Sequence, residues 1–194
     1  MAISDEGVLA GPLSSRPLGR NEMMRSIREE QDKDFATIRE VNVQAFAGFE
    51  EADIVDKLRD SGGSVLSLVA SHNDDVVGHI QFSPVLIEHE GAVIEGVGLG
   101  PMAVLPDHQR RGFGSDLVEA GIKAMRDRSY PFVIVLGHPN YYPRFGFELA
   151  SAHGISCQWP DVPDEAFMVL ILDEGGMRNV RGEARYPEVF GETE

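Results

Sequence analysis

Cysteine is almost absent from this chain, which has one, Cys157, among 194 residues. A single cysteine cannot form a disulfide within the chain, and such scarcity is typical of proteins that fold in a reducing compartment. No base stands beside Cys157 in the sequence, so we interpret it as a packing residue rather than a nucleophile. A domain of this length buries enough surface to fold without disulfides or a structural metal.

Basic residues are also scarce. The chain has 17 Lys and Arg against 32 Asp and Glu, for a formal net charge of −15. An acidic surface repels the phosphate backbone of nucleic acids, so the sequence predicts no nucleic-acid partner. The same charge attracts cationic molecules such as amines, and Glu50, Glu51 and Asp53 are candidates for that attraction. The alternative is that these carboxylates only keep the protein soluble.

No long hydrophobic run is present. The longest weakly charged apolar stretch, residues 92–106, is interrupted by Glu95 and by glycines, and it is too short to span a bilayer. Residues 1–22 lack the apolar segment of a signal peptide. We therefore expect no membrane association and a cytoplasmic protein, with residues 1–22 as a flexible N-terminal extension.

Hydrophobic periodicity predicts an α/β fold of the α+β kind, with helices on the faces of a mixed sheet. Helices are predicted at 32–46, 51–60 and 110–128. Strands are predicted at 24–29, 64–71, 76–86, from about 92 to Leu105, and at 131–136, 154–158 and 165–172. A short irregular or helical piece is expected at 141–147. These elements define one domain over residues 23–174, and residues 175–194 are expected to form a polar C-terminal tail.

The stretch from Met102 to Gly114 carries the strongest chemical signal. A strand ends there, and a long helix begins inside a loop that contains Gly112 and Gly114. The first turn of a helix presents unpaired N–H groups and the positive end of the macrodipole, and glycine lets an anion approach the backbone. Arg110 and Arg111 add positive charge, so the segment predicts a pyrophosphate site. The spacings of a P-loop and of a dinucleotide-binding loop are both missing.

Two motifs in this order resemble the GNAT (GCN5-related N-acetyltransferase) superfamily. Gln109-Arg110-Arg111-Gly112-Phe113-Gly114 after a strand is similar to its cofactor signature. Tyr142-Pro143-Arg144-Phe145-Gly146-Phe147 resembles its second signature, in which a tyrosine stands four residues before a Gly-Phe pair. Shorter segments at 99–101, 137–139, 162–168 and 185–187 resemble a bacterial subgroup of predicted small N-acetyltransferases. The resemblance covers residues 24–190.

The resemblance implies a sheet in which two central parallel strands, near 98–105 and 131–137, splay apart. It implies acetyl-CoA as the acyl-donor cosubstrate, with the pantetheine arm along residues 102–104 and the pyrophosphate at 110–115. The residues expected to bind it are Met102, Ala103, Val104, Gln109, Arg110, Arg111, Gly112, Phe113, Gly114 and Ser115. The acetyl group would pass to a primary amine of a small molecule or peptide, and a homodimer is kept as a candidate assembly.

The resemblance also implies a catalytic set. Tyr142 matches the acid that protonates the departing thiolate, and Tyr141 beside it is the alternative. A backbone N–H on the splayed strand, from Val104, is expected to polarise the thioester carbonyl. Glu95 is the nearest candidate base, His79 on the preceding strand is another, and either of them could act through water. An amine that arrives neutral needs no dedicated base.

The sequence leaves other function classes open. Its six histidines show no metal-ligand spacing, so no metal is expected. One alternative is a module on the same fold that binds acyl-CoA and regulates a partner without chemistry. Another is an unrelated phosphate-binding α/β domain, which would use Gly112 and Gly114 but not Tyr142.

Overall fold

The computed structural model describes residues 25–191, and the predicted extension over residues 1–22 lies outside this range. The strands are β1 (Arg25–Glu29), β2 (Leu66–His72), β3 (Asp75–His89), β4 (Ala92–Val104), β5 (Phe132–Leu136), β6 (Glu148–Leu149), β7 (Ile155–Cys157), β8 (Phe167–Ile171) and β9 (Gly182–Arg185). The α-helices are α1 (Phe35–Phe46), α2 (Glu50–Asp60) and α3 (Phe113–Asp127). The 3-10 helices are η1 (Asp32–Asp34), η2 (Pro106–His108), η3 (Tyr142–Phe145), η4 (Ala150–His153), η5 (Asp164–Ala166) and η6 (Glu188–Phe190).

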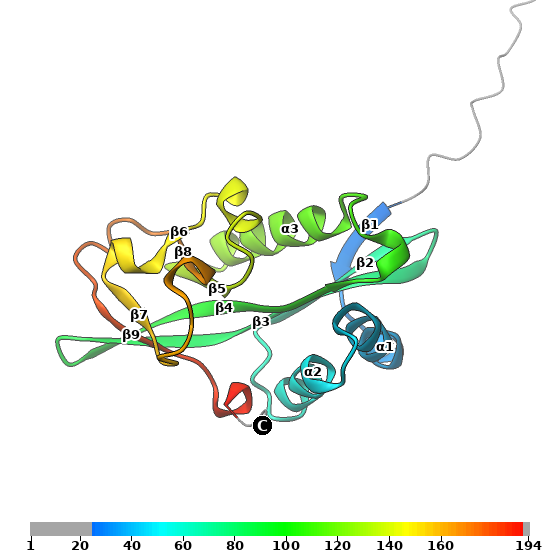
Figure 1. The fold of residues 1–194 in the computed structure, drawn as a ribbon, viewed down its shortest axis with the longest axis horizontal. Helices are drawn as coiled ribbons and strands as arrows, with labels where there is room; N and C mark the ends of the chain where they lie inside the picture. Colours follow the sequence, from blue (N-terminus) through cyan, green and yellow to red (C-terminus); the bar gives the residue numbers. More distant parts are fainter. Residues whose placement is uncertain (1–24, 192–194) are drawn as a thin grey trace, which may run out of the picture.

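All the strands belong to one mixed sheet with helices on both faces (Figure 1), as the sequence predicts. The main path is β1-β2-β3-β4-β5-β8-β6, and β9 pairs with β3 and β7. The pairs β4–β5 and β7–β9 are parallel. The antiparallel pairs β2–β3 and β3–β4 are hairpins, and their turns contain positive-φ backbone at Asn73, Asp74, Glu90 and Gly91. Asn, Asp and Gly tolerate that conformation best.

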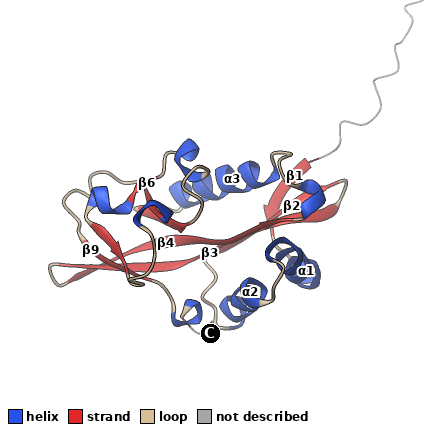
Figure 2. Ribbon diagram, viewed as in Figure 1, coloured by secondary structure: helices blue, strands red, loops and turns tan. Residues whose placement is uncertain are grey.

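The two faces of the sheet carry different helices. Figure 2 shows α3 on one face and α1 with α2 on the other. The apolar stripe of α3 packs Leu117 and Met125 against β2, β3 and β4, while Ile38 and Val41 of α1 pack on the opposite face. Because both faces are covered, β2 is a nearly continuous buried run. None of the helices within residues 25–191 is long and apolar enough to cross a membrane.

The C-terminal segment is part of the sheet, which corrects the expectation of a tail after residue 174. β9 pairs with β3 through Leu86–Arg185 and Ile87–Ala184, and Ala184 is fully buried. Met177 and Val180 are buried in the same cluster. The sequence pattern missed β9 because its four residues, GEAR, lack the apolar alternation of a strand.

A chain of polar side chains is buried between the sheet and α1. The Ser67 hydroxyl donates to Glu30 Oε2 at 2.6 Å, so its oxygen accepts from His79 Nε2–H at 3.0 Å. His79 Nδ1 then accepts from the Asn42 amide at 3.2 Å. Desolvation lowers the pKa of His79 from 6.5 to about 4, and the neighbouring Glu30 carboxylate offsets this only in part. His79 is therefore a neutral structural residue in the folded protein.

The depressed pKa of His79 makes stability depend on pH. The unfolded chain binds a proton near pH 6.5 and the folded chain only near pH 4, so stability falls as pH drops through this window. Between pH 7 and pH 5 we expect the parent to lose about 2 kcal/mol more unfolding free energy than His79→Gln, which has no imidazole. Urea denaturation at several pH values measures this difference. Equal losses in the two proteins would exclude His79 as a source of the pH dependence.

Candidate functional site

The candidate site begins where two parallel strands separate. β4 and β5 are paired over three residue pairs, the last of which is Leu99–Val135. β4 then continues to Val104 without β5. Gly100 and Pro101 of β4 together oppose one residue of β3, Gln81. A bulge of this kind bends a strand and increases its twist, and here it coincides with the point of separation.

Beyond the bulge, the backbone of β4 faces an open edge. The Leu105 N–H donates to the Val77 carbonyl at 2.9 Å, which makes this a hydrogen-bonded pair of the β3–β4 ladder. In an antiparallel ladder, hydrogen-bonded pairs alternate with pairs that are not hydrogen-bonded to each other. The N–H and C=O groups of Val104 and Met102 therefore point away from β3. The Gln109 side-chain amide already donates to the Val104 carbonyl at 3.0 Å. This edge can therefore pair with an extended ligand, as a further strand would.

A cavity of about 960 Å³ lies at the separation. Part of its wall comes from β4, from the end of β5 and from the segment that follows it: Leu99, Gly100, Pro101, Met102, Leu136, Gly137, His138, Asn140, Tyr141 and Tyr142. The rest comes from the α1–α2 region and the C-terminal part of the chain: Phe46, Glu51, Ile54, Trp159, Val162, Tyr186, Phe190 and Gly191. We call this the central cavity. Because α1 and α2 lie on the face opposite α3, its wall joins both sides of the sheet (Figure 2).

A second cavity, of about 520 Å³, lies at the start of α3, and we call it the loop cavity. Seven of the ten predicted cofactor residues line it: Met102, Val104, Gln109, Arg110, Gly112, Gly114 and Ser115. The other three do not. Ala103 packs in the cluster on the α1 face, Phe113 is buried between the rings of His72 and His108, and Arg111 Nη1 lies 3.5 Å from His108 Nδ1. Met102 and Tyr141 line both cavities, so the two adjoin.

The loop cavity has the features of an anion site. Gly112 is the N-cap of α3 with φ of 95°, a conformation that favours glycine. The first turn of α3 presents N–H groups that the helix itself leaves unpaired. Arg110 contributes a cation from the loop, and Arg144 contributes a second one from η3. Sequence reasoning missed Arg144, although it stands inside the motif at 142–147 that we singled out.

Arg144 is held in place by two contacts. Its Nη2 donates to Ser115 Oγ at 2.9 Å, which connects η3 to the first turn of α3. Its guanidinium lies 4.0 Å from the centroid of the Tyr141 ring, a cation–π contact. The cation is therefore aimed at the helix start before any ligand binds.

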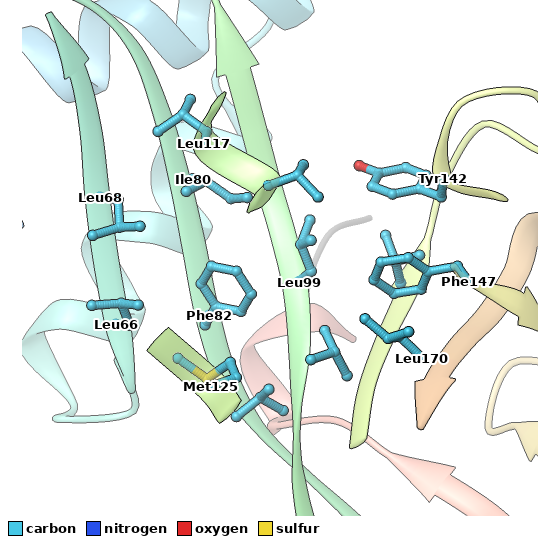
Figure 3. Close-up of a cluster of buried hydrophobic side chains, with 14 of the residues drawn as sticks. Leu66, Leu68, Ile80, Phe82, Leu99, Leu117, Met125, Tyr142, Phe147 and Leu170 are labelled. Atoms are coloured by element: carbon cyan, nitrogen blue, oxygen red, sulfur yellow. The ribbon is translucent and has the colours of Figure 1, made fainter. Parts of the chain in front are cut away.

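Tyr142 stands at the wall of the central cavity. Its side chain is buried to 7% exposure and packs against Phe147, with ring centroids 5.6 Å apart. Figure 3 shows the hydroxyl directed towards β4. Burial raises the pKa of the phenol well above 10, so Tyr142 keeps its proton throughout the neutral range. The Tyr142 ring can occupy this position only because residue 137 is glycine, since a Cβ there would collide with the ring.

The remaining predicted catalytic residues lie in different places. Glu95 is exposed, opposite Leu86 in the β3–β4 hairpin, and it lines neither cavity. His79 is engaged with Asn42 and Ser67 on the α1 side. Val104 lines the loop cavity and not the central one. Within residues 25–191, no group of three or more His, Cys, Asp and Glu side chains is arranged to hold a metal ion.

Three aromatic side chains form a wall that sequence reasoning missed. Tyr186 lies between Trp159 and Phe190, with ring centroids 5.2 Å and 5.4 Å away. Its ring packs against β4 at Gly98, where an added Cβ would come within 2.6 Å of Cε1. We call these three residues the aromatic wall. Trp159 lies far from the other two in the sequence, so no local sequence pattern indicates that the three side chains meet.

Comparison with known proteins agrees with this geometry. The sequence profile of the Acetyltransferase (GNAT) domain matches residues 26–150. The uncharacterized N-acetyltransferase YhbS of Escherichia coli K12 is 36% identical over 148 residues, which are 76% of this chain and 87% of YhbS. The uncharacterized N-acetyltransferase YjhQ of the same organism is 38% identical over 135 residues, or 68% of this chain and 74% of YjhQ.

Two solved structures are similar over most of the chain. The crystal structure of E. coli YhbS in complex with CoA has a TM-score of 0.84 at 33% identity, and it covers 91% of this chain and 97% of that one. A GNAT-family acetyltransferase from Brucella melitensis in complex with acetyl-CoA has a TM-score of 0.71 at 34% identity, with 87% and 99% coverage.

The fold and the matching profile together define an acetyltransferase. The chain belongs to the GNAT family, as its two motifs predicted. It is an enzyme of the N-acetyltransferase class.

The packing of the Tyr186 ring against β4 can be tested by a substitution at Gly98. We expect Gly98→Ala to lower the free energy of unfolding by ~1–3 kcal/mol, because the new methyl group overpacks the contacts with Tyr186 and Val85. Gly48→Ala is the matched control, since a Cβ there meets no atom within 4 Å. Urea unfolding of both variants measures the difference. Equal stabilities would mean that Tyr186 does not sit against β4.

Proposed function

We propose that this enzyme transfers an acetyl group from acetyl-CoA to a primary amine of a small molecule or peptide. The observation that carries this proposal is the meeting of two cavities at Met102. One contains a helix N-terminus with two arginines, and the other opens where β4 and β5 separate. The complexes of the two relatives with CoA and acetyl-CoA support the choice of donor.

The loop cavity fits the anionic end of acetyl-CoA. The pyrophosphate would accept hydrogen bonds from the backbone N–H groups in the first turn of α3, and it would form ion pairs with Arg110 and Arg144. The extended pantetheine arm would then pair with the outward backbone of Val104 and with the carbonyl group of Met102. This arrangement directs the thioester from the loop cavity towards the central cavity.

The position of Val104 changes the choice of carbonyl polariser. In acetyl-CoA the thioester lies at the far end of the pantetheine arm from the pyrophosphate, and Val104 lines only the cavity at the pyrophosphate end. Met102 lines both cavities, and its N–H also points away from β3. We therefore assign the N–H of Met102 to the developing oxyanion and the backbone of Val104 to the pantetheine arm.

Tyr142 fits the role of general acid. Acetyl-CoA supplies a thioester whose carbonyl carbon forms a bond to the neutral amine nitrogen as its bond to sulfur breaks. Tyr142 gives its proton to the departing sulfur, and the proton that the nitrogen loses restores the phenol through solvent. The raised pKa of Tyr142 ensures that this proton is present at neutral pH.

Acetyl-CoA binding can be tested by thermal unfolding. At about 100 times its dissociation constant, acetyl-CoA should stabilise the parent by ~2.7 kcal/mol. Arg110→Gln should weaken its affinity about tenfold because a phosphate contact is lost. Arg126→Gln, the same change on an exposed residue in the last turn of α3, should leave the affinity unchanged. If acetyl-CoA does not stabilise the parent, the cofactor assignment is wrong. If the two variants bind acetyl-CoA equally well, the pyrophosphate does not bind at Arg110.

Tyr142→Phe should lower kcat at least ~10²-fold while leaving acetyl-CoA affinity unchanged, because the hydroxyl acts only as the thiolate forms. Tyr141→Phe is the matched control and should have a much smaller effect. Thiol release under saturating substrates measures kcat for both. If Tyr141→Phe is the impaired variant, the acid is the neighbouring tyrosine. If neither variant is slower, protonation of the sulfur does not depend on a tyrosine.

A further inference from the structure

The central cavity has an unusual charge balance for this protein. Among the residues of the range 25–191 that line it, none is Lys or Arg, and Glu51 is the only carboxylate. A carboxylate or phosphate on the acceptor would therefore meet no Lys or Arg side chain in this described part of the wall. Burying such an anion without a partner is costly, so the cavity disfavours acidic acceptors such as free amino acids.

Glu51 is free to bind a cation. It is one of three acidic residues in the first turn of α2. Asp53 is engaged by Arg39 at 2.7 Å, and Glu50 is exposed outside the cavity. Glu51 is half-buried and has no ion pair among residues 25–191. Its carboxylate can therefore accept hydrogen bonds from an ammonium group without breaking an existing contact.

Most of the remaining wall on the Glu51 side is apolar. The aromatic wall of Trp159, Tyr186 and Phe190 is joined there by Ile54 and Val162. Aromatic rings bury large areas of an apolar ligand, and their faces also attract cations. In Figure 1 the C-terminal η6 lies beside α2, and the two elements are in contact. The Glu51 carboxylate and the aromatic wall therefore line the same part of the central cavity.

We propose that the acceptor is a small primary amine with an apolar, ring-sized body and no anionic group. Its body lies against the aromatic wall, and Glu51 binds its ammonium group. This inference rests on the proposed acetyl transfer and specifies the substrate class of the same site. The ammonium must lose a proton before its nitrogen attacks the thioester, and among the described residues of the wall Glu51 is the one carboxylate that can accept it.

The substrate class can be tested with four amines at saturating acetyl-CoA. 2-Phenylethylamine has the proposed body and charge. Phenylalanine adds a carboxylate to it, ethylamine lacks the ring, and spermidine has several charges and no apolar body. We expect kcat/KM for 2-phenylethylamine, measured by thiol release, to exceed each of the other three values at least about tenfold. A preference for phenylalanine or spermidine would overturn the proposal.

The role of Glu51 has its own matched control. Glu51→Gln should lower kcat/KM for 2-phenylethylamine about tenfold at neutral pH, because the ammonium loses its anionic partner. Glu50→Gln, the same change one residue earlier but outside the cavity, should leave it unchanged. The defect of Glu51→Gln should shrink as the pH rises and more of the amine is neutral. Equal activities of the two variants, or a defect that does not depend on pH, would overturn the assignment of Glu51.

Failure of this inference can be distinguished from failure of the proposed function. If acetyl-CoA stabilises the protein but 2-phenylethylamine is acetylated no faster than its analogues, the substrate class is wrong and the cofactor site stands. If acetyl-CoA does not bind at all, the proposed function fails, and the assignment of the acceptor fails with it.

Discussion

The short parallel pairing of β4 and β5 is the constraint on which the site depends. Three residue pairs hold the strands together, and the bulge at Gly100 and Pro101 then directs β4 away. If β5 followed β4 to its end, it would take the outward N–H and C=O groups of Met102 and Val104. The separation leaves the N–H groups of both residues and the carbonyl of Met102 available, while the Val104 carbonyl accepts from Gln109. It also opens the central cavity beside them. One local change in strand pairing thus creates both the open edge of β4 and the central cavity.

The same separation lets the two faces of the sheet carry opposite chemistry. On the α3 face, a helix N-terminus and the cations Arg110 and Arg144 form an anion site in a protein with a net charge of −15. On the α2 face, the described part of the central cavity's wall has Glu51 and aromatic rings but no Lys or Arg. An anionic donor and a cationic acceptor would therefore approach from different directions, each towards complementary charge.

Close packing at glycines supports this arrangement. Gly98 allows Tyr186 to lie against β4, and Gly137 allows Tyr142 to reach the wall of the cavity. A side chain at either position would meet a ring that the site uses. On the face that α1 covers, the neutral His79 and its hydrogen-bond partners hold α1 against β2 and β3. The positions of the reactive groups therefore depend on residues that touch no substrate.

The segment from Met102 to Gly114 and its chemistry could be predicted from the order of residues alone, because a strand end, a glycine-bearing loop and a helix start are neighbours in the chain. The helix and strand pattern, and the family, followed from the same local periodicity and from the motif at 142–147. The folding of distant segments brought Arg144 to Ser115 and Tyr186 to Trp159, and it placed Tyr186 and Glu51 in the wall of the same cavity. It also placed Glu95 outside both cavities and put Val104 at the loop end. These outcomes depend on contacts between residues far apart in sequence, whose free energy comes from packing in three dimensions and leaves no periodic pattern in the chain.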